Sequence, residues 1–74
     1  MKEIPLLAVV ALAEDNPTEG LKCGESGTVV ELLGTEEDPA YLVEFSDESG
    51  RAYAFADLRP EQLIVLHRKP SEAA

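Results

Sequence analysis

The sequence predicts an all-β domain, built as a small five-stranded barrel with one 3₁₀ or α-helical turn before the last strand. Short apolar segments recur along the 74 residues and are separated by turn sequences rich in Gly, Pro, Asn and Asp. One of these segments, residues 41–45, alternates between two faces with the period of two that is typical of a half-buried strand. Closure into a barrel is expected because it removes the open edges that so apolar a small sheet would otherwise expose.

The first strand is expected in the apolar run L-L-A-V-V-A-L-A at residues 6–13. Its eight residues are short for a helix, and the two adjacent β-branched valines favour a buried strand. The polar segment E-D-N-P-T-E-G at residues 14–20 follows as a long loop, in which Pro17 starts a turn and Gly20 can adopt a positive φ.

A tight re-entry at residues 22–27 leads from this loop into the second strand, residues 28–33, which are mostly β-branched or aliphatic. The re-entry contains Gly24 and Gly27, and at both positions we expect that a Cβ atom would clash. Turn geometry explains these glycines better than phosphate binding, because their spacing is too loose and no helix follows them.

A hairpin supplies the third and fourth strands. The third strand, residues 41–45, follows an acidic loop at residues 34–39 and places Tyr41, Val43 and Phe45 on one face. These three side chains are the best candidates for the core, with Phe45 the clearest.

The fourth strand, residues 51–56, pairs back after the turn S-D-E-S-G, whose Gly50 suits a left-handed conformation. One face of R-A-Y-A-F-A carries its three alanines, and the other face carries Tyr53 and Phe55. Alternation alone does not tell which face points inward. If the alanines face the core, the aromatic pair is exposed and marks an interface.

The segment D-L-R-P-E-Q-L, which begins at Asp57, interrupts the strand pattern. Asp57 can cap a helix and Pro60 suits its first position, so a single helical turn is expected. The fifth strand follows at residues 63–67. Residues 1–67 then form one domain, and the polar residues 68–74 form a flexible tail.

This order of strands, with a long first loop and a helical turn before the last strand, is that of SH3-like barrels. A more specific resemblance lies in the pattern E-D-x-P-x-x-G-L-x-x-G-x-x-G-T-V-V-E, followed by Y-x-V-E-F and an acidic turn that ends in Gly. The chain resembles, from about Ile4 to His67, a family of short acidic bacterial SH3-like barrel proteins of unassigned function. The resemblance implies a free-standing small barrel, and an immunity or antitoxin role is implied by toxin-like genes beside some members.

The charge of the chain restricts its partners. Fifteen acidic residues against six basic ones give a formal net charge of −9. Such a field attracts a cationic partner, and it opposes nucleic acid, whose affinity comes largely from phosphates neutralised by Lys and Arg. The alternative that the acidity serves solubility alone stays open.

The sequence offers little for catalysis, and we expect no enzymatic activity, cofactor or bound metal. The lone cysteine, Cys23, has no His or Arg near it in sequence, and the lone histidine, His67, has no Ser or Cys near it in sequence. The acidic residues 36–38 lack the alternating spacing of a calcium loop. The apolar run at residues 6–13 is too short to span a membrane, and together with the lone thiol it predicts a cytoplasmic protein.

The glycine-rich segment around Lys22 is similar to the KOW segments that contact RNA in ribosomal and transcription proteins. Lys22 is surrounded by acidic residues, so we interpret the segment as structural. The less favoured nucleic-acid hypothesis requires Lys22, Arg51 and Arg59 to converge on one face with Arg68 and Lys69.

Recognition of a protein is the leading functional hypothesis: a non-enzymatic acidic module docks a cationic protein partner. The candidate partner-binding residues are Glu14, Asp15 and Glu19 on the first loop and Tyr53 and Phe55 on the fourth strand. Two alternatives are a structural or accessory subunit of an enzyme complex, by a looser likeness to the SH3-like domain of nitrile hydratase β-subunits, and a homodimer.

Overall fold

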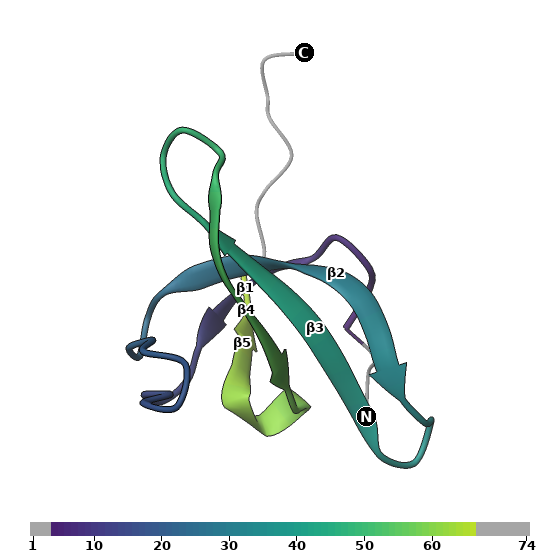
Figure 1. Ribbon diagram of the computed structural model, residues 1–74. Helices are drawn as coiled ribbons and strands as arrows, with labels where there is room; N and C mark the ends of the chain where they lie inside the picture. The colour runs from purple at the N-terminus through teal and green to yellow at the C-terminus, as the bar shows by residue number, and fades with distance from the viewer. Residues whose placement is uncertain (1–3, 67–74) are drawn as a thin grey trace.

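The computed structural model describes residues 4–66, which form one antiparallel sheet of five strands (Figure 1). The strands are β1 (Val9–Leu12), β2 (Ser26–Gly34), β3 (Pro39–Ser46), β4 (Ala52–Leu58) and β5 (Leu63–Val65). A 3₁₀ helix, η1 (Pro60–Gln62), precedes β5. The all-β class, the five strands and the helical turn are therefore confirmed, whereas His67 and the expected tail at 68–74 lie outside the described residues.

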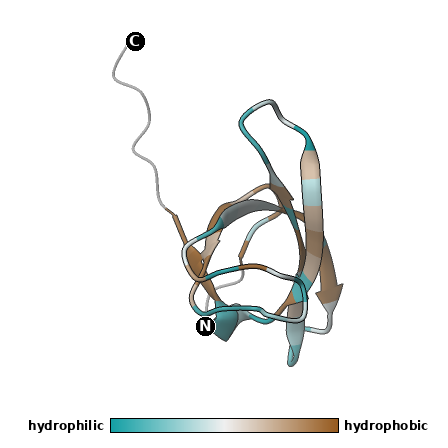
Figure 2. Ribbon diagram, turned by 60° about the vertical axis from the view of Figure 1, so that its left-hand side comes forward, coloured by the Kyte–Doolittle hydropathy of each residue, from teal (hydrophilic) through white to brown (hydrophobic). Residues whose placement is uncertain are grey.

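The sheet has the strand order β4-β3-β2-β1-β5 and curls around its own core (Figure 2). Within residues 4–66, β4 pairs with β3 and β5 pairs with β1, so the ladder of hydrogen bonds does not close and no closed barrel is detected. The turn between β3 and β4 projects from the body of the sheet (Figure 1).

The core is formed by the inward faces of the strands. Val10, Val29, Val43 and Phe45 have no exposed surface, and Tyr41 is almost fully buried. The predicted inward face of the third strand is thus confirmed, with Phe45 at its centre.

The fourth strand turns its alanine face inward. Ala56 and Leu58 are buried, while Tyr53 and Phe55 are 52% and 50% exposed. Ala56 and Phe45 belong to the same core cluster and Ala54 packs against it, while Ala52 at the start of the strand is exposed.

Most predicted strand boundaries differ from the observed ones by one to three residues, and two of these errors have a visible cause. The first strand begins at Val9 instead of residue 6, because Ala8 N–H donates to the Pro5 carbonyl (3.1 Å) in a turn with Leu7 at φ +69°. The fourth strand runs on through Asp57, which pairs with Leu42, so Asp57 does not cap η1. The strand continues because β3 starts early enough to supply partners.

The two glycines of the re-entry differ in their role. A Cβ at Gly27 would lie 2.6 Å from the Glu44 carbonyl oxygen, which confirms the expected clash. A Cβ at Gly24 would meet no atom within 4 Å, so the clash predicted there is wrong. Gly24 is instead required by its φ of +93°, which side chains on L-residues rarely permit.

Candidate functional site

A groove of about 400 Å³ lies between the first loop and the outer face of β3 and β4. It is lined from the loop by Asn16, Thr18 and Glu19, and from the sheet by Leu42, Phe55, Ala56 and Asp57. The groove therefore brings the first loop together with residues 55–57 of β4, which lie more than thirty residues further along the chain, and with Leu42 of β3.

The sheet wall of the groove follows from the alternation of β4. Because Ala56 and Leu58 point into the core, Phe55 and Asp57 point outward. On β3, Glu44 lies opposite Phe55 and Leu42 lies opposite Asp57, so they occupy the same outer face. An aromatic ring thus stands exposed beside carboxylates.

The loop wall is a tight reversal. Asn16 and Leu21 exchange two backbone hydrogen bonds of 2.8 and 2.9 Å, and Glu19 N–H donates to the Asn16 side chain at 3.3 Å. Leu21, only 3% exposed, anchors the reversal in the core. This anchoring holds Thr18 and Glu19 at the groove.

Two carboxylates fasten the rest of the loop. Asp15 accepts a hydrogen bond from the Cys23 backbone N–H at 2.8 Å. Glu25 accepts one from the Tyr53 hydroxyl at 2.7 Å and one from the Lys22 backbone N–H at 2.8 Å, which links the loop to β4. The Tyr53 hydroxyl, and after it the Lys22 N–H, lower the pKa of Glu25, and the Glu25 carboxylate raises the pKa of Tyr53.

The structure brings together only two of the five predicted partner-binding residues, Glu19 and Phe55. Glu14 is exposed but does not line the groove, and Asp15 serves to hold the loop. Tyr53 is on the same face of β4 as Phe55, but its hydroxyl is engaged with Glu25.

The sequence interpretation missed Asp57 as a groove residue because it assigned this residue to a helix cap. The signal was present: the alternation of the fourth strand continues through Ala56 to Leu58, which places Asp57 on the same face as Phe55. Asn16 and Thr18 carried no comparable signal, since their position depends on how the loop folds back.

The groove suits a cationic group beside an apolar surface. Glu19 and Asp57 supply two carboxylates and Phe55 supplies a half-exposed ring, while none of the residues that line the groove is Lys or Arg. A cation on such a surface gains attraction from the carboxylates and from the face of the ring. Among the residues described, no group of three or more His, Cys, Asp and Glu side chains is placed to hold a metal ion.

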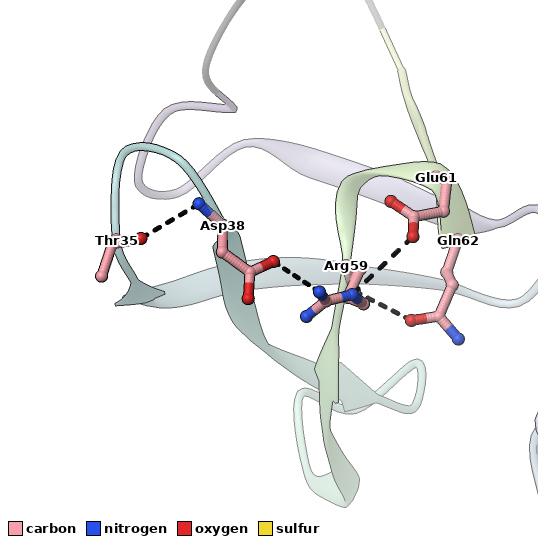
Figure 3. A network of polar contacts seen from close by, with 5 residues as sticks. All are labelled: Thr35, Asp38, Arg59, Glu61 and Gln62. Carbon is pink, nitrogen blue, oxygen red and sulfur yellow. Dashed lines mark hydrogen bonds and ion pairs between the residues drawn. The ribbon is translucent and has the colours of Figure 1, made fainter.

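Arg59, one of the basic residues of the nucleic-acid hypothesis, is surrounded by acidic side chains. The Arg59 guanidinium forms an ion pair with the Asp38 carboxylate, and the Arg59 Nε lies 3.7 Å from a Glu61 carboxylate oxygen (Figure 3). The Asp38 backbone N–H donates to the Thr35 hydroxyl. The backbone N–H of Arg59 donates to the side-chain oxygen of Gln62 at 2.9 Å. Arg59 is therefore already in contact with acids, and the predicted convergence with Arg68 and Lys69 falls outside the described residues.

Comparison with known proteins gave one family. The model of the family described as "Domain of unknown function (DUF4926)" matches residues 6–65. Searches of curated proteins and of solved structures gave no match. Across residues 4–66, no helix is long and apolar enough to cross a membrane.

Proposed function

The chain belongs to this family of unknown function, and from that premise we propose that it is a non-enzymatic binding module whose acidic groove docks a basic segment of another protein. The observation that carries the proposal is the meeting of Glu19, Phe55 and Asp57 in one groove. Segments of the loop and of β4 that are remote in sequence contribute to it.

The expected strength of this contact follows from its parts. Exposed ion pairs contribute about 0.2–1 kcal/mol each, and a cation over an exposed ring adds about 0.5–1 kcal/mol. Glu19, Asp57 and Phe55 together therefore supply on the order of 2 kcal/mol, which is too little for a stable complex by itself. The groove selects a basic segment, while the charge of −9 accelerates encounter and makes binding sensitive to salt.

We also propose that the curled sheet is an SH3-like barrel. Its long first loop, the hairpin between β3 and β4 and the position of η1 before β5 support this assignment. A cytoplasmic immunity or antitoxin protein that neutralises a cationic partner fits the acidic surface.

A pull-down with the tagged chain, at low and at high salt, tests the proposal. A basic protein retained at low salt and released at high salt is expected, because screening removes most of the attraction between exposed charges. Recovery of no basic protein at low salt would refute the proposal.

The groove itself is tested by isothermal titration with the partner so identified. Glu19→Gln/Asp57→Asn is expected to weaken binding about tenfold, in line with two lost ion pairs. Glu36→Gln/Glu37→Gln, in the loop between β2 and β3, removes the same charge outside the groove and should change binding no more than about twofold through the general field. Equal losses in both variants would show that the net charge, and not the groove, binds the partner.

A further inference from the structure

The strand that supplies Phe55 and Asp57 to the groove has an open edge. Within residues 4–66 the strand order is β4-β3-β2-β1-β5, so β4 pairs with β3 on one side and with no strand on the other. Sheet edges are commonly protected by short strands, by Pro or Lys, or by bulges. β5, at the opposite edge, is three residues long, whereas β4 has seven residues without Pro or Lys and pairs regularly with β3 from Ala54 to Leu58. The edge of β4 is therefore long and regular enough to accept a further strand.

Two contacts of β2 show that the Glu44 backbone faces β2 and not β4. A Cβ on Gly27 of β2 would lie 2.6 Å from the Glu44 carbonyl oxygen, so this carbonyl points from β3 toward β2. The Val29 N–H donates to the Ala8 carbonyl at 2.9 Å, on the β1 side of β2. Because neighbouring residues of a strand face opposite sides in an antiparallel ladder, Thr28 then faces β3, where Glu44 is its partner.

The direction of Glu44 determines which backbone groups of β4 are free. Glu44 lies opposite Phe55, and a residue that faces β2 cannot also form ladder bonds to β4. The N–H and C=O of Phe55 therefore point away from β3, toward the open edge. The pattern repeats every second residue, so those of Asp57 point the same way, whereas those of Ala54 and Ala56 bond to β3.

These free groups lie beside the groove. Phe55 and Asp57 line it from the sheet, and Asn16, Thr18 and Glu19 line it from the first loop. Within residues 4–66 no backbone hydrogen bond joins Phe55 or Asp57 to that loop. A segment that lies in the groove can therefore form main-chain hydrogen bonds with both residues, in addition to contacts with their side chains.

We propose that the basic segment bound by the groove adds to β4 as a further strand, an inference that rests on the proposed function and specifies how the partner binds. Main-chain hydrogen bonds to Phe55 and Asp57 then supply affinity that the exposed ion pairs lack. Side chains of a strand alternate, so every second side chain of the added strand lies on the outer face, beside Phe55 and Asp57. The cationic residues of the partner are therefore expected at alternate positions of an extended segment.

Charge favours a basic segment over a second copy of this chain at the edge. Pairing of two β4 edges would bring their Asp57 side chains toward each other in two chains of charge −9, which repel. A basic segment instead meets the carboxylates of Glu19 and Asp57, and no Lys or Arg lines the groove. Opposite charge therefore directs such a segment to the place where the backbone of β4 is free.

Peptides of identical charge test the added strand. The parent probe has seven residues, the length of β4, with lysine at every second position and threonine between. Two derivatives carry N-methyl groups, one on the lysine amides and the other on the amides between them. Only one of these two sets of amides can face β4 in an added strand. In NMR titrations at about 20 mM NaCl, the dissociation constants of the two derivatives should differ by at least about tenfold, through loss of main-chain hydrogen bonds.

Hydrogen exchange locates the added strand on the full chain. The amides of Phe55 and Asp57 should exchange rapidly in the free protein and at least about tenfold more slowly with saturating parent peptide. The amides of Ala54 and Ala56 are the matched controls, because they bond to β3 and should exchange slowly in both states.

Equal binding of the two methylated peptides, or unchanged exchange at Phe55 and Asp57, would overturn the added strand. No binding of the parent peptide at about 1 mM would overturn it as well. Protection of Phe55 and Asp57 that grows with chain concentration, without peptide, would show that β4 pairs with a second copy instead. In each of these cases the pull-down and the titration of Glu19→Gln/Asp57→Asn still decide the proposed function separately.

Discussion

Replacement of Gly27 by alanine tests the close approach of β2 to β3. The new Cβ would lie 2.6 Å from the Glu44 carbonyl oxygen, 2.8 Å from Val43 Cγ1 and 3.1 Å from Phe45 Cδ2. Val43 and Phe45 are fully buried, and side chains in a close-packed core have little room to shift. The carbonyl oxygen belongs to the ladder between the two strands, so relief of this contact requires a shift of the backbone.

The size of the effect follows from these contacts. Overpacking of a well-packed core costs typically 1–3 kcal/mol, and we expect about 3 kcal/mol at Gly27 because a backbone atom is involved. Replacement of glycine by alanine recovers about 0.4–1 kcal/mol by restricting the unfolded chain. The free energy of unfolding should therefore fall by about 2 kcal/mol, equivalent to a loss of about 8–16 °C in Tm for a chain of this length.

Urea unfolding followed by far-UV circular dichroism measures this change, and Gly24 provides the control. Gly24 has open space around it but a φ of +93°, and Asn tolerates left-handed backbone better than other residues with side chains. Gly24→Asn should cost less than about 1 kcal/mol, whereas Gly27→Asn should unfold the protein. A Gly27→Ala variant as stable as the parent, or a Gly24→Asn variant less stable than Gly27→Asn, would refute the packing argument.

Three further predictions concern the strained turn, the core and the loop contact. Leu7→Asn should raise the free energy of unfolding by about 0.5–1 kcal/mol in urea titrations at low protein concentration, because Leu7 holds φ at +69° with an exposed side chain. Phe45→Ala should cost about 3–5 kcal/mol and leave the chain largely unfolded by circular dichroism, whereas Phe55→Ala, at an exposed position, should lie within about 0.5 kcal/mol of the parent. The lowered pKa of Glu25 adds stability above its ordinary pKa of 4.5, which is lost as the pH falls through the lower folded-state pKa. Tyr53→Phe removes the hydrogen bond that is the largest cause of the lowered Glu25 pKa. The free energy of unfolding of this variant should therefore fall less steeply below pH 4.5 than that of the parent. The same pH dependence in both proteins would show that the hydrogen bond between Tyr53 and Glu25 does not contribute to stability.

Much of the fold could be predicted from the sequence because strand signals are local. The alternation at residues 41–45 and the two glycine-ended turns depend on neighbouring residues only, and such signals predicted five strands and their succession along the chain, though not their order in the sheet. The helical turn around Pro60 is equally local, since Pro fixes its own φ. The boundaries were less certain, because a strand ends where its partner ends.

The groove could be anticipated only in part, since it depends on contacts between distant segments. Glu19 and Phe55, two of the predicted partner-binding residues, line it, but nothing in the sequence distinguishes Glu19 at the groove from Asp15, which accepts a hydrogen bond from a backbone N–H eight residues away. Asp57 lines the groove because β3 begins early enough to pair with β4 beyond Ala56. Whether a residue lines the groove therefore depends on the register between strands and on how the first loop folds back.

The sequence by itself determined an all-β chain with five strands, an acidic surface and membership of its family, because composition, periodicity and motifs are properties of the chain alone. Only the tertiary structure decided which face of β4 enters the core. Period two predicts two faces and gives them equal status, and the choice depends on the space left by Phe45 and its neighbours when the sheet curls. That choice exposes Phe55, and with it forms the groove.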